Sequence, residues 1–481
     1  MASQLCSNPG LASDSNKTAT KTTTKNRILR LLTQFGQETT LHGCKHLQDS
    51  NSPIFLRVAW SLILITMVAA LAISLTMLWI HYRSYPFTTV WSLSREAYVP
   101  LPSLTLCLYA DFDTQKTASW QDATQYMDNR WHVDQLLTNQ FANLNYSEAQ
   151  QRFGFDTNDV FLGVFSSVLK EHTIIRLSDW VTPDPDPGRA CWIIYKTKNL
   201  DSGEDFKIGM FDSFVMILNP MTARAGRGFE ALGVELYFHE PGTRYWLQRG
   251  LGIMPGAYAD VRLKPERTKF LPSPYNSAGS KGCVDTQDPD FVNPLRFFES
   301  YSLDLCISEL LIKEVQKECS CVSQPYASML HVNECTVLQY QTCYFGARQR
   351  IMSETLLSDS SQCLDLCNTR KFSSTISYSK YDAQKVQETL QIVAASDFQL
   401  APESEMADLI RIRIQPLSMD VTTMEHVPET TLLDVFAQVG GFMGLFLGAS
   451  LMTLVEIIDV VLLMGWTWLL SSARRERKLE E

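Results

Sequence analysis

A glycine-rich run followed by two carboxylates is the part of the sequence whose residue types point most directly to chemistry. Residues 440–450 read GGFMGLFLGAS, and Glu456 and Asp459 follow on the same apolar segment. Each glycine inside a helix costs about 1 kcal/mol relative to alanine, so the run needs a compensating role. A helix break at residues 448–450 would free backbone carbonyls that can replace part of a cation's hydration shell. Glu456 and Asp459 are three residues apart and share one helical face, where they would attract cations.

Two less specific interpretations of this segment remain open. Gly441 and Gly444 by themselves fit a tightly packed interface between helices. Glu456 and Asp459 fit an inner membrane interface, where carboxylates lie among lipid headgroups. The packing interpretation leaves Gly448-Ala449-Ser450 and the carboxylates unexplained, so we favour a cation site.

Long apolar runs place this segment in a membrane. Val58–Ile80 is free of charged residues and, at ~1.5 Å per residue, is long enough to cross a ~30 Å hydrocarbon core. Val435–Val455 is a second such run, and Val460–Leu470 extends it. Basic residues precede the first run and follow the last, which places both termini in the cytosol. We predict a cytosolic N-terminus over residues 1–54, transmembrane helix 1 over 55–81, an extracellular domain over 82–428, transmembrane helix 2 with the cation site over 429–470 and a basic cytosolic tail over 471–481.

The cysteines indicate a disulfide framework in the predicted extracellular part. The chain has 12 cysteines, and an even number in an oxidising compartment is typical of disulfide pairing. The ten in this part are Cys107, Cys191, Cys283, Cys306, Cys319, Cys321, Cys335, Cys343, Cys363 and Cys367. Cys319 and Cys321 resemble a zinc-ligand pair, but structural zinc usually wants two to four intervening residues. We therefore predict disulfides and no metal site, with Cys6 and Cys44 as free cytosolic thiols.

Composition and motifs exclude several classes of protein. The chain has 42 Lys and Arg against 52 Asp and Glu, a net charge of −10, which argues against a nucleic-acid partner. It has no nucleophile elbow, zinc-ligand helix or phosphate loop, so we expect neither an enzyme nor a cofactor. An ectoenzyme or an adhesion receptor with two anchors remains possible, but a simple anchor needs neither a glycine-broken helix nor Glu456. The sequon Asn145-Tyr-Ser147 predicts a glycosylated surface loop.

Local patterns predict a mixed α and β domain between the spans. Tyr98–Cys107 and Phe229–Phe238 alternate apolar and polar residues, as strands do. Trp131–Leu144 fits an amphipathic helix, and Leu303–Val315 carries apolar residues at helical spacing just before the cysteine cluster.

The segment GGFMGLFLGASLMTLVEIID resembles, almost position for position, the second-span signature of the epithelial sodium channel, degenerin and acid-sensing ion channel superfamily. His42-Gly43 matches the cytosolic gating motif of that family, and Pro102–Cys107 is similar to its strand after the first span. GIMPG at 252–256 and LPSPY at 271–275 are similar to further landmarks. The resemblance covers most of the chain. It implies a trimeric channel whose subunits have two transmembrane helices flanking a large disulfide-rich α/β extracellular domain.

The resemblance also assigns roles to single residues. It puts the selectivity filter on Gly448, Ala449 and Ser450, with Glu456 and Asp459 as the pore acids. The gate falls on Ala437, Gln438, Gly440, Gly441 and Gly444. Tyr275 would contact Tyr85 and couple the extracellular domain to the pore, although Tyr82 fits nearly as well and ordinary interfacial tyrosines remain an alternative. The implied disulfides are Cys107–Cys191, Cys283–Cys367, Cys306–Cys363, Cys319–Cys343 and Cys321–Cys335.

Two departures from the family pattern bear on function. Gln438 stands where the family usually has an acid, so a carboxylate ring at the outer pore mouth is missing. Arg348 and Arg350 replace the paired aspartates of acid-sensing relatives, which argues against that proton sensor. We therefore expect an amiloride-sensitive, sodium-selective channel of the plasma membrane, opened by an extracellular neuropeptide of the FMRFamide type. A proton-gated or constitutively open channel of the same fold is the alternative. The implied partners are sodium ions, a peptide ligand, an amiloride-type blocker, the lipid bilayer and two further copies in a homotrimer.

Overall fold

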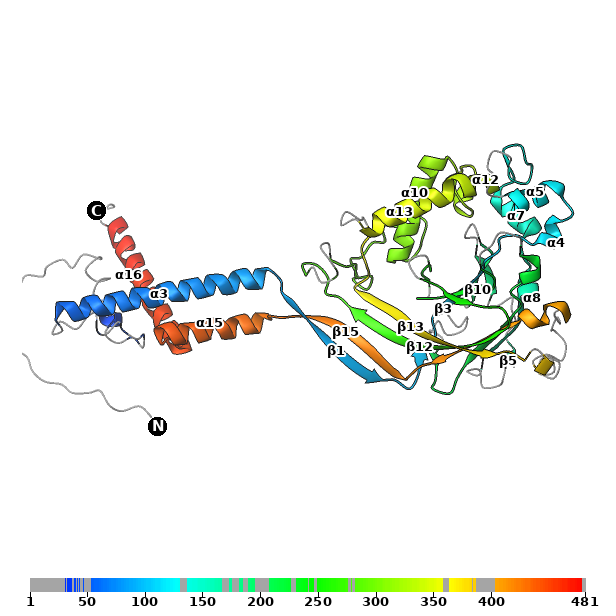
Figure 1. Cartoon of the computed structure of the whole chain (residues 1–481). Helices are drawn as coiled ribbons and strands as arrows, with labels where there is room; N and C mark the ends of the chain where they lie inside the picture. Colours follow the sequence, from blue (N-terminus) through cyan, green and yellow to red (C-terminus); the bar gives the residue numbers. More distant parts are fainter. Residues whose placement is uncertain are drawn as a thin grey trace, which may run out of the picture. The chain divides into compact units, whose positions relative to one another are not determined.

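The structure is a computed structural model of the whole chain, and it divides into two compact units (Figure 1). The helical unit comprises residues 1–86 and 429–481, and the sheet unit comprises residues 87–428. The structure describes residues 31, 33–36, 39, 41, 43, 46, 53–129, 136–166, 173–174, 181–184, 189–194, 207–225, 231–240, 242–245, 249–275, 278, 282–357, 363–382, 384–385 and 403–477.

The helical unit contains one long apolar helix and a second helix that is broken. Helix α3, Ile54–Arg83, is long and apolar enough to cross a membrane, and it contains the run predicted as the first span. Helices α15, Leu432–Leu447, and α16, Leu451–Arg477, meet the same criteria only as a pair, with a bend of 82° between them. Helix α15 packs against α3, as Figure 1 shows. The predicted second span is therefore two helices separated at residues 448–450.

The sheet unit is built on two main sheets. The larger sheet has the order β1-β15-β12-β14-β9-β4-β5, with β13 also paired to β12. Strand β12 runs parallel to β14 and β15, and the other pairs are antiparallel. The strands are β1 Phe87–Arg95, β4 Phe161–Ser166, β5 Thr173–Ile174, β9 Phe214–Leu218, β12 Ala257–Lys269, β13 Asn368–Lys380, β14 Ile410–Pro416 and β15 Asp420–Pro428.

The smaller sheet has the order β11-β10-β3-β7-β6, and a separate pair joins β2 to β8. These strands are β2 Val99–Pro100, β3 Ser103–Leu108, β6 Val181–Asp184, β7 Cys191–Ile194, β8 Lys207–Ile208, β10 Val234–His239 and β11 Leu251–Ile253. Side chains from both sheets form one apolar core, represented by Leu106 of β3, Met216 of β9 and Ile412 of β14, each 0% exposed.

Both strand predictions are confirmed for position, and both strands are more fully buried than their alternating residue types indicate. The segment Tyr98–Cys107 forms β2 and β3, and all six residues of β3 are buried. Phe229–Phe238 becomes β10 from Val234 onward, whereas residues 229–230 lie outside the described residues. Both strands lie inside the smaller sheet. One face of this sheet packs on the main apolar core, and a small separate cluster of Cys107, Cys191, Tyr237 and Tyr245 covers the other face. A strand covered on both faces does not need an exposed polar side.

Most helices of the sheet unit lie beside the cysteine cluster. They are α4 Thr114–Thr117, α5 Gln121–Asn129, α7 Tyr146–Phe153, α8 Thr157–Val160, α10 Leu303–Cys319, α11 Tyr326–Leu330, α12 Val337–Gln339 and α13 Phe345–Leu357, with a π-helical turn η2 Tyr340–Tyr344 and 3₁₀ turns η1 Thr222–Arg224 and η3 Glu403–Asp408. Helix α10 confirms the prediction over Leu303–Val315. It begins where the Ser302 side chain accepts a hydrogen bond from the Leu305 N–H, at 3.2 Å.

The helix predicted over Trp131–Leu144 is wrong for its described part. Residues 131–135 lie outside the described residues, and residues 137–144 form turns. The Asn139 side chain accepts a hydrogen bond from the Ala142 N–H at 3.0 Å and donates one to the Asp122 carbonyl at 2.8 Å. Such side-chain bonds to the backbone offer an alternative to the helical ladder, and they hold this segment against α5.

All five predicted disulfides are confirmed. They join Cys107 to Cys191, Cys283 to Cys367, Cys306 to Cys363, Cys319 to Cys343 and Cys321 to Cys335. The bridges at Cys319 and Cys321 belong to a second apolar core that joins α5 and α7 to α10 and α13. Cys6 and Cys44 lie outside the described residues, so their predicted free thiols stay a prediction.

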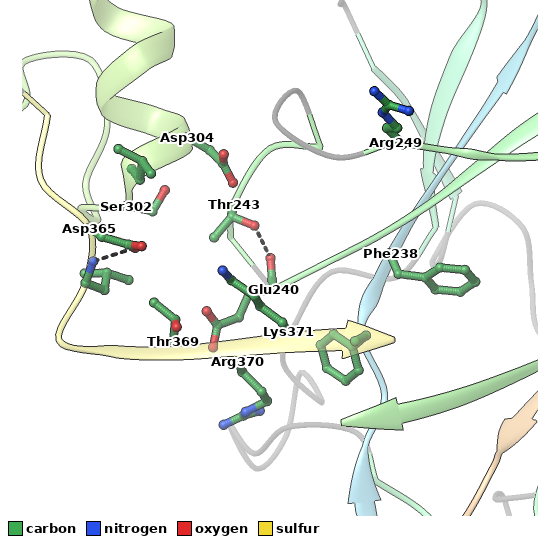
Figure 2. Close-up of a pocket in the computed structure, with 13 residues that line it drawn as sticks. Phe238, Glu240, Thr243, Arg249, Ser302, Asp304, Asp365, Thr369, Arg370 and Lys371 are labelled. Atoms are coloured by element: carbon green, nitrogen blue, oxygen red, sulfur yellow. Dashed lines mark hydrogen bonds between the residues drawn. The ribbon is translucent and has the colours of Figure 1, made fainter. Parts of the chain in front are cut away.

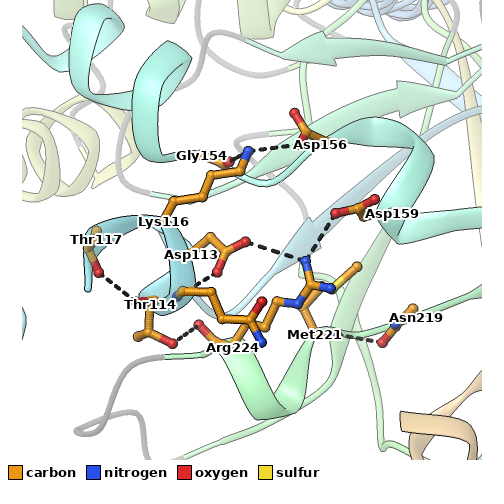
Figure 3. A network of polar contacts seen from close by, with 11 residues as sticks. Asp113, Thr114, Lys116, Thr117, Gly154, Asp156, Asp159, Asn219, Met221 and Arg224 are labelled. Carbon is orange, nitrogen blue, oxygen red and sulfur yellow. Dashed lines mark hydrogen bonds and ion pairs between the residues drawn. The ribbon is translucent and has the colours of Figure 1, made fainter. Parts of the chain in front are cut away.

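A buried ionic network centred on Arg224 links segments that are far apart in the sequence (Figure 3). The Arg224 guanidinium lies 3.5 Å from the Asp113 carboxylate and 3.0 Å from that of Asp159. Asp113, with a side chain only 1% exposed, also caps α4 by accepting from the Gln115 N–H at 2.8 Å. The Thr114 hydroxyl donates to the Arg224 carbonyl at 2.9 Å. One arginine thus ties η1 to α4 and α8.

Candidate functional site

The end of α15 shows how the glycine-rich run produces a break. The N–H of Gly448 donates to the Gly444 carbonyl at 3.0 Å, and the N–H of Ala449 donates to the Met443 carbonyl at 3.2 Å. Gly448 has φ 62°, the left-handed conformation in which glycine ends helices without the strain that a side chain would bring. The break predicted at residues 448–450 is therefore confirmed, and Gly448 is the residue that makes it.

A threonine that the sequence interpretation missed holds the turn after the break. The Ser450 N–H donates to Oγ1 of Thr453 at 3.0 Å, and the Ser450 hydroxyl lies 3.5 Å from the same oxygen. Thr453 is fully buried, whereas Ser450 is exposed. The Leu454 N–H then donates to the Ser450 carbonyl at 3.3 Å, which starts α16. A hydroxyl residue three positions after another at a helix start is the signal that could have identified Thr453.

The bend exposes backbone that an unbroken helix would hide. The last four carbonyls of any helix lack intrahelical partners, and here a bend of 82° removes the turn that would have followed. Gly444 already accepts from Gly448, which leaves the carbonyls of residues 445–447 at the bend. Non-helical backbone at membrane depth is tolerated where it lines a water-filled cavity or is buried in protein. This geometry suits carbonyl coordination of a cation.

The five residues predicted for the gate all lie on α15 and are exposed: Ala437, Gln438, Gly440, Gly441 and Gly444. A Cβ added at Gly440 or Gly441 would meet no atom within 4 Å among the described residues. Packing within the described part of one chain therefore does not require glycine at these two positions. Small residues that leave a helix face open allow a second helix to approach closely.

The two predicted pore acids lie on α16 beyond the break. Glu456 is half-buried and accepts a hydrogen bond from the Thr39 hydroxyl at 3.2 Å, whereas Asp459 is exposed. Thr39 precedes α3 by fifteen residues, so the N-terminal segment reaches the acidic residue nearest the break. In the sequence, the His42-Gly43 pair is the feature that marks this segment. It gave no signal for the contact with Glu456.

The cytosolic pair His42-Gly43 is described only at its glycine. Gly43 has φ +89°, and a Cβ built there would lie 3.6 Å from the Leu64 side chain and 3.9 Å from that of Trp60. Both neighbours belong to α3. Glycine at this position is favoured by its backbone conformation. His42 lies outside the described residues, so its gating role stays a prediction.

Tyr85 and Tyr275, predicted to couple the two parts of the chain, belong to different units. Tyr85 follows α3 in the helical unit with a left-handed φ of 50°, and Tyr275 follows β12 in the sheet unit. Their pairing stays a prediction. The predicted glycosylation residue Asn145 is exposed at the start of α7. The Ser147 hydroxyl of its sequon donates to Glu334 at 2.7 Å. Glycosylation also stays a prediction.

The arginines in place of an acidic pair lie on α13. Arg350 forms an ion pair with Glu318 of α10. This pairing uses a carboxylate to hold two helices together, so it offers no pair of acids that could share a proton.

A different carboxyl group titrates near neutral pH. Burial, together with the charges of Asp365 and Glu240, raises the pKa of Asp304 to about 7, although Lys371 acts in the opposite direction. Asp304 lies in the first turn of α10 and lines a pocket, where Figure 2 shows its carboxylate beside Thr243. No spacing in the sequence indicates this group, because its neighbours come from segments far away in the chain.

The sequence comparisons with known proteins agree on one family. The family model described as "Amiloride-sensitive sodium channel" matches residues 35–460. The bile acid-sensitive ion channel of Mus musculus is 22% identical, with 88% of this chain and 86% of the mouse protein covered. Acid-sensing ion channel 1B of Danio rerio is 22% identical (90% and 76% covered), and acid-sensing ion channel 1 of Gallus gallus is 21% identical (88% and 82% covered). A cryo-EM structure of a proton-activated chloride channel matches with a TM-score of only 0.31 and 7% identity, over 85% of this chain and 97% of that one.

Proposed function

The chain belongs to the amiloride-sensitive sodium channel family, and we propose that it is one subunit of a sodium-selective, amiloride-sensitive channel of the plasma membrane. The observation that carries this proposal is the helix break at Gly448-Ala449-Ser450, between α15 and α16. In this proposal the exposed backbone and Ser450 select the ion, and Glu456 and Asp459 attract cations to the same path.

We extend the proposal to a homotrimer with two spans per subunit and both termini in the cytosol. One broken helix exposes too few oxygens to replace a hydration shell, so several copies are needed around one axis. The open faces at Gly440 and Gly441 support close packing of α15 against other copies. Arg57 at the start of α3 and the arginines at the end of α16 support the orientation.

The stimulus that we propose is an extracellular peptide, as in neuropeptide-gated members of the superfamily. The ion pair of Arg350 with Glu318 supports this choice, because it stands where paired acids would have to share a proton. The relatives above are named for bile acid and for acid, so each of those stimuli is a comparison condition. Proton gating is the second candidate, and the observation that favours it is the pKa of about 7 at Asp304.

Reversal potentials in sodium and potassium baths test the pore. We expect a preference for sodium, block by amiloride, and loss of conduction without loss of surface expression in Ser450→Leu. Ser74→Leu is the matched control, because it makes the same change in the apolar helix α3 away from the break. Normal conduction and ion preference in Ser450→Leu would place the filter elsewhere.

Whole-cell recording during sequential application of acid, a bile acid and a panel of short amidated peptides tests the stimulus. We expect current with a peptide and none with mild acid alone. A rapid proton-activated sodium current in cells that express only this chain would replace the peptide proposal with the proton proposal.

A further inference from the structure

A cavity of about 440 Å³ lies in the sheet unit where three distant segments meet (Figure 2). The segment after β10 contributes Glu240, the first turn of α10 contributes Asp304, the segment that leads into β13 contributes Asp365, and β13 itself contributes Lys371. A second cavity of about 490 Å³ shares Glu240 and other lining residues with it. Cavities of a few hundred Å³ have the size of sites for small organic ligands.

Covalent and backbone bonds hold two of the three walls in place. The disulfide Cys306–Cys363 joins α10 to the segment before β13. The Val284 N–H donates to the Asp365 carbonyl and the Cys367 N–H donates to the Val284 carbonyl, both at 2.8 Å. Walls that are already ordered cost little to order when a ligand binds, so this pocket is suited to binding.

Negative charge predominates around Asp304, although the whole lining has three acidic and three basic side chains. Figure 2 shows the side chains of Glu240, Asp304, Asp365 and Lys371 directed into the pocket, with Arg249 and Arg370 at its edges. Three carboxylates thus face one lysine. The crowding is strong enough that burial, Asp365 and Glu240 raise the pKa of Asp304 to about 7.

Two lining groups have no hydrogen-bond partner in the part of the chain that the structure describes. Among the described residues, the Asp304 carboxylate takes part in no hydrogen bond or ion pair. The Thr369 hydroxyl is buried and has no hydrogen-bond partner there either. Leaving the buried Thr369 hydroxyl unpaired is costly, whereas the half-buried Asp304 carboxylate still reaches solvent. A ligand with a cationic hydrogen-bond donor would satisfy the carboxylate and reduce the repulsion around it.

The same pocket offers apolar contacts. Phe238, Leu303, Leu366 and Phe372 all line it. Phe238 is only 7% exposed, and Leu303 and Leu366 belong to an apolar cluster with Cys306 and Cys363, so these side chains are fixed. A ligand that carried only a charge would leave this surface uncovered.

We propose that this pocket binds a small organic cation with an apolar portion, through Asp304, Asp365 and Glu240. A basic residue of a short peptide belongs to this class, so the proposal deepens the ligand gating proposed above and rests on it only for the effect on current. Lys371 opposes the ligand's charge and therefore limits affinity. An anion of the same size bound beside Asp304 would meet the charges of Asp365 and Glu240, so this part of the pocket discriminates against it.

Benzamidine and benzoate are the probes, since they share a ring and differ in the sign of the charge. Their binding to the purified full-length protein is measured by titration calorimetry. We expect benzamidine to bind and benzoate not to bind. Asp304→Asn should weaken benzamidine about tenfold, as expected for a lost charge-assisted hydrogen bond, and Lys371→Gln should strengthen it. Asp290→Asn removes an exposed carboxylate outside the pocket and is the matched control.

The opposite signs separate a binding role from a structural one. If Asp304→Asn and Lys371→Gln both weaken benzamidine, the residues only support the fold and the proposal fails. Binding that neither variant changes lies at another site, such as the pore, and also overturns it. The proposal also fails if benzoate binds as tightly as benzamidine, or if benzamidine does not bind. Because binding is measured without current, these failures leave the proposed sodium conduction untouched.

Discussion

Replacing Asp304 with asparagine is expected to stabilise the protein at neutral and alkaline pH and to have little effect in acid. The pKa of this carboxyl rises from the ordinary 3.8 to about 7, first because of burial and then because of Asp365 and Glu240. The folded chain therefore keeps a proton that the unfolded chain releases between about pH 4 and about pH 7. The free energy of unfolding falls as the pH rises through that window, and it is lowest above it.

The size of the effect follows from the same pKa. A rise from 3.8 to about 7 corresponds to roughly 4 kcal/mol at ~1.36 kcal/mol per pH unit. The side chain lines an open pocket and lies in the first turn of α10, where a negative charge gains about 0.3–1 kcal/mol. After allowance for both, we expect Asp304→Asn to gain about 2 kcal/mol at about pH 8 and less than about 0.5 kcal/mol at about pH 4.

Urea unfolding of the detergent-solubilised full chain, followed by tryptophan fluorescence at both pH values, measures this difference. The control Asp290→Asn makes the same chemical change at an exposed residue, and its stability should follow that of the unmodified chain at each pH. A variant Asp304→Asn that is less stable at alkaline pH, or whose gain is the same in acid, would refute the reasoning. It would mean that solvent or an ion pair stabilises the charged form of the Asp304 carboxylate in the folded protein.

Three further predictions concern the break, the gate and the fold. Thr453→Val removes the oxygen that accepts from the Ser450 N–H, so we expect a changed sodium-to-potassium permeability ratio at normal surface expression; an unchanged ratio would mean that this bond does not shape the filter. Replacing Ala437 with a bulky residue, or modifying Ala437→Cys, should hold the channel open, and an unaltered resting current would disprove its place at the gate. Arg224→Met leaves the buried Asp113 carboxylate without its cation and should cost about 3–5 kcal/mol in urea unfolding; adding Asp113→Asn should recover part of this loss, and no recovery would show that the ion pair is not the cause.

Local features of the sequence were enough for several elements. The apolar spacing over Leu303–Val315 was enough to predict α10, because helical periodicity is a local property of the sequence. Gly448 marks the break, because a left-handed helix end favours glycine over any residue with a side chain. The five disulfides were predicted through the resemblance of the cysteine pattern to a family, and the structure contains the same pairs.

Other predictions failed because long-range contacts decided the outcome. The segment before Leu144 has a helical pattern, but Asn139 bonds the backbone of Asp122 and Ala142 and forms turns instead. Strand β3 has alternating residue types, yet the structure buries every residue, because material packs on both of its faces. Alternation in the sequence is typical of a strand with one solvent-facing side, whereas both faces of β3 are covered.

By itself, the sequence determined where the second apolar helix breaks and where the apolar helices run. With the family pattern it also determined which cysteines join. Glycines and apolar periodicity act on the backbone within a few residues, so local sequence carries this information. Only the tertiary structure decided which distant polar groups meet. It placed Thr39 on Glu456, Thr453 under Ser450, and Glu240 and Asp365 around Asp304. The pKa of a carboxyl depends on its burial and on neighbouring charges. Both are set by segments that lie far apart in the chain, so no local pattern of residues carries that information.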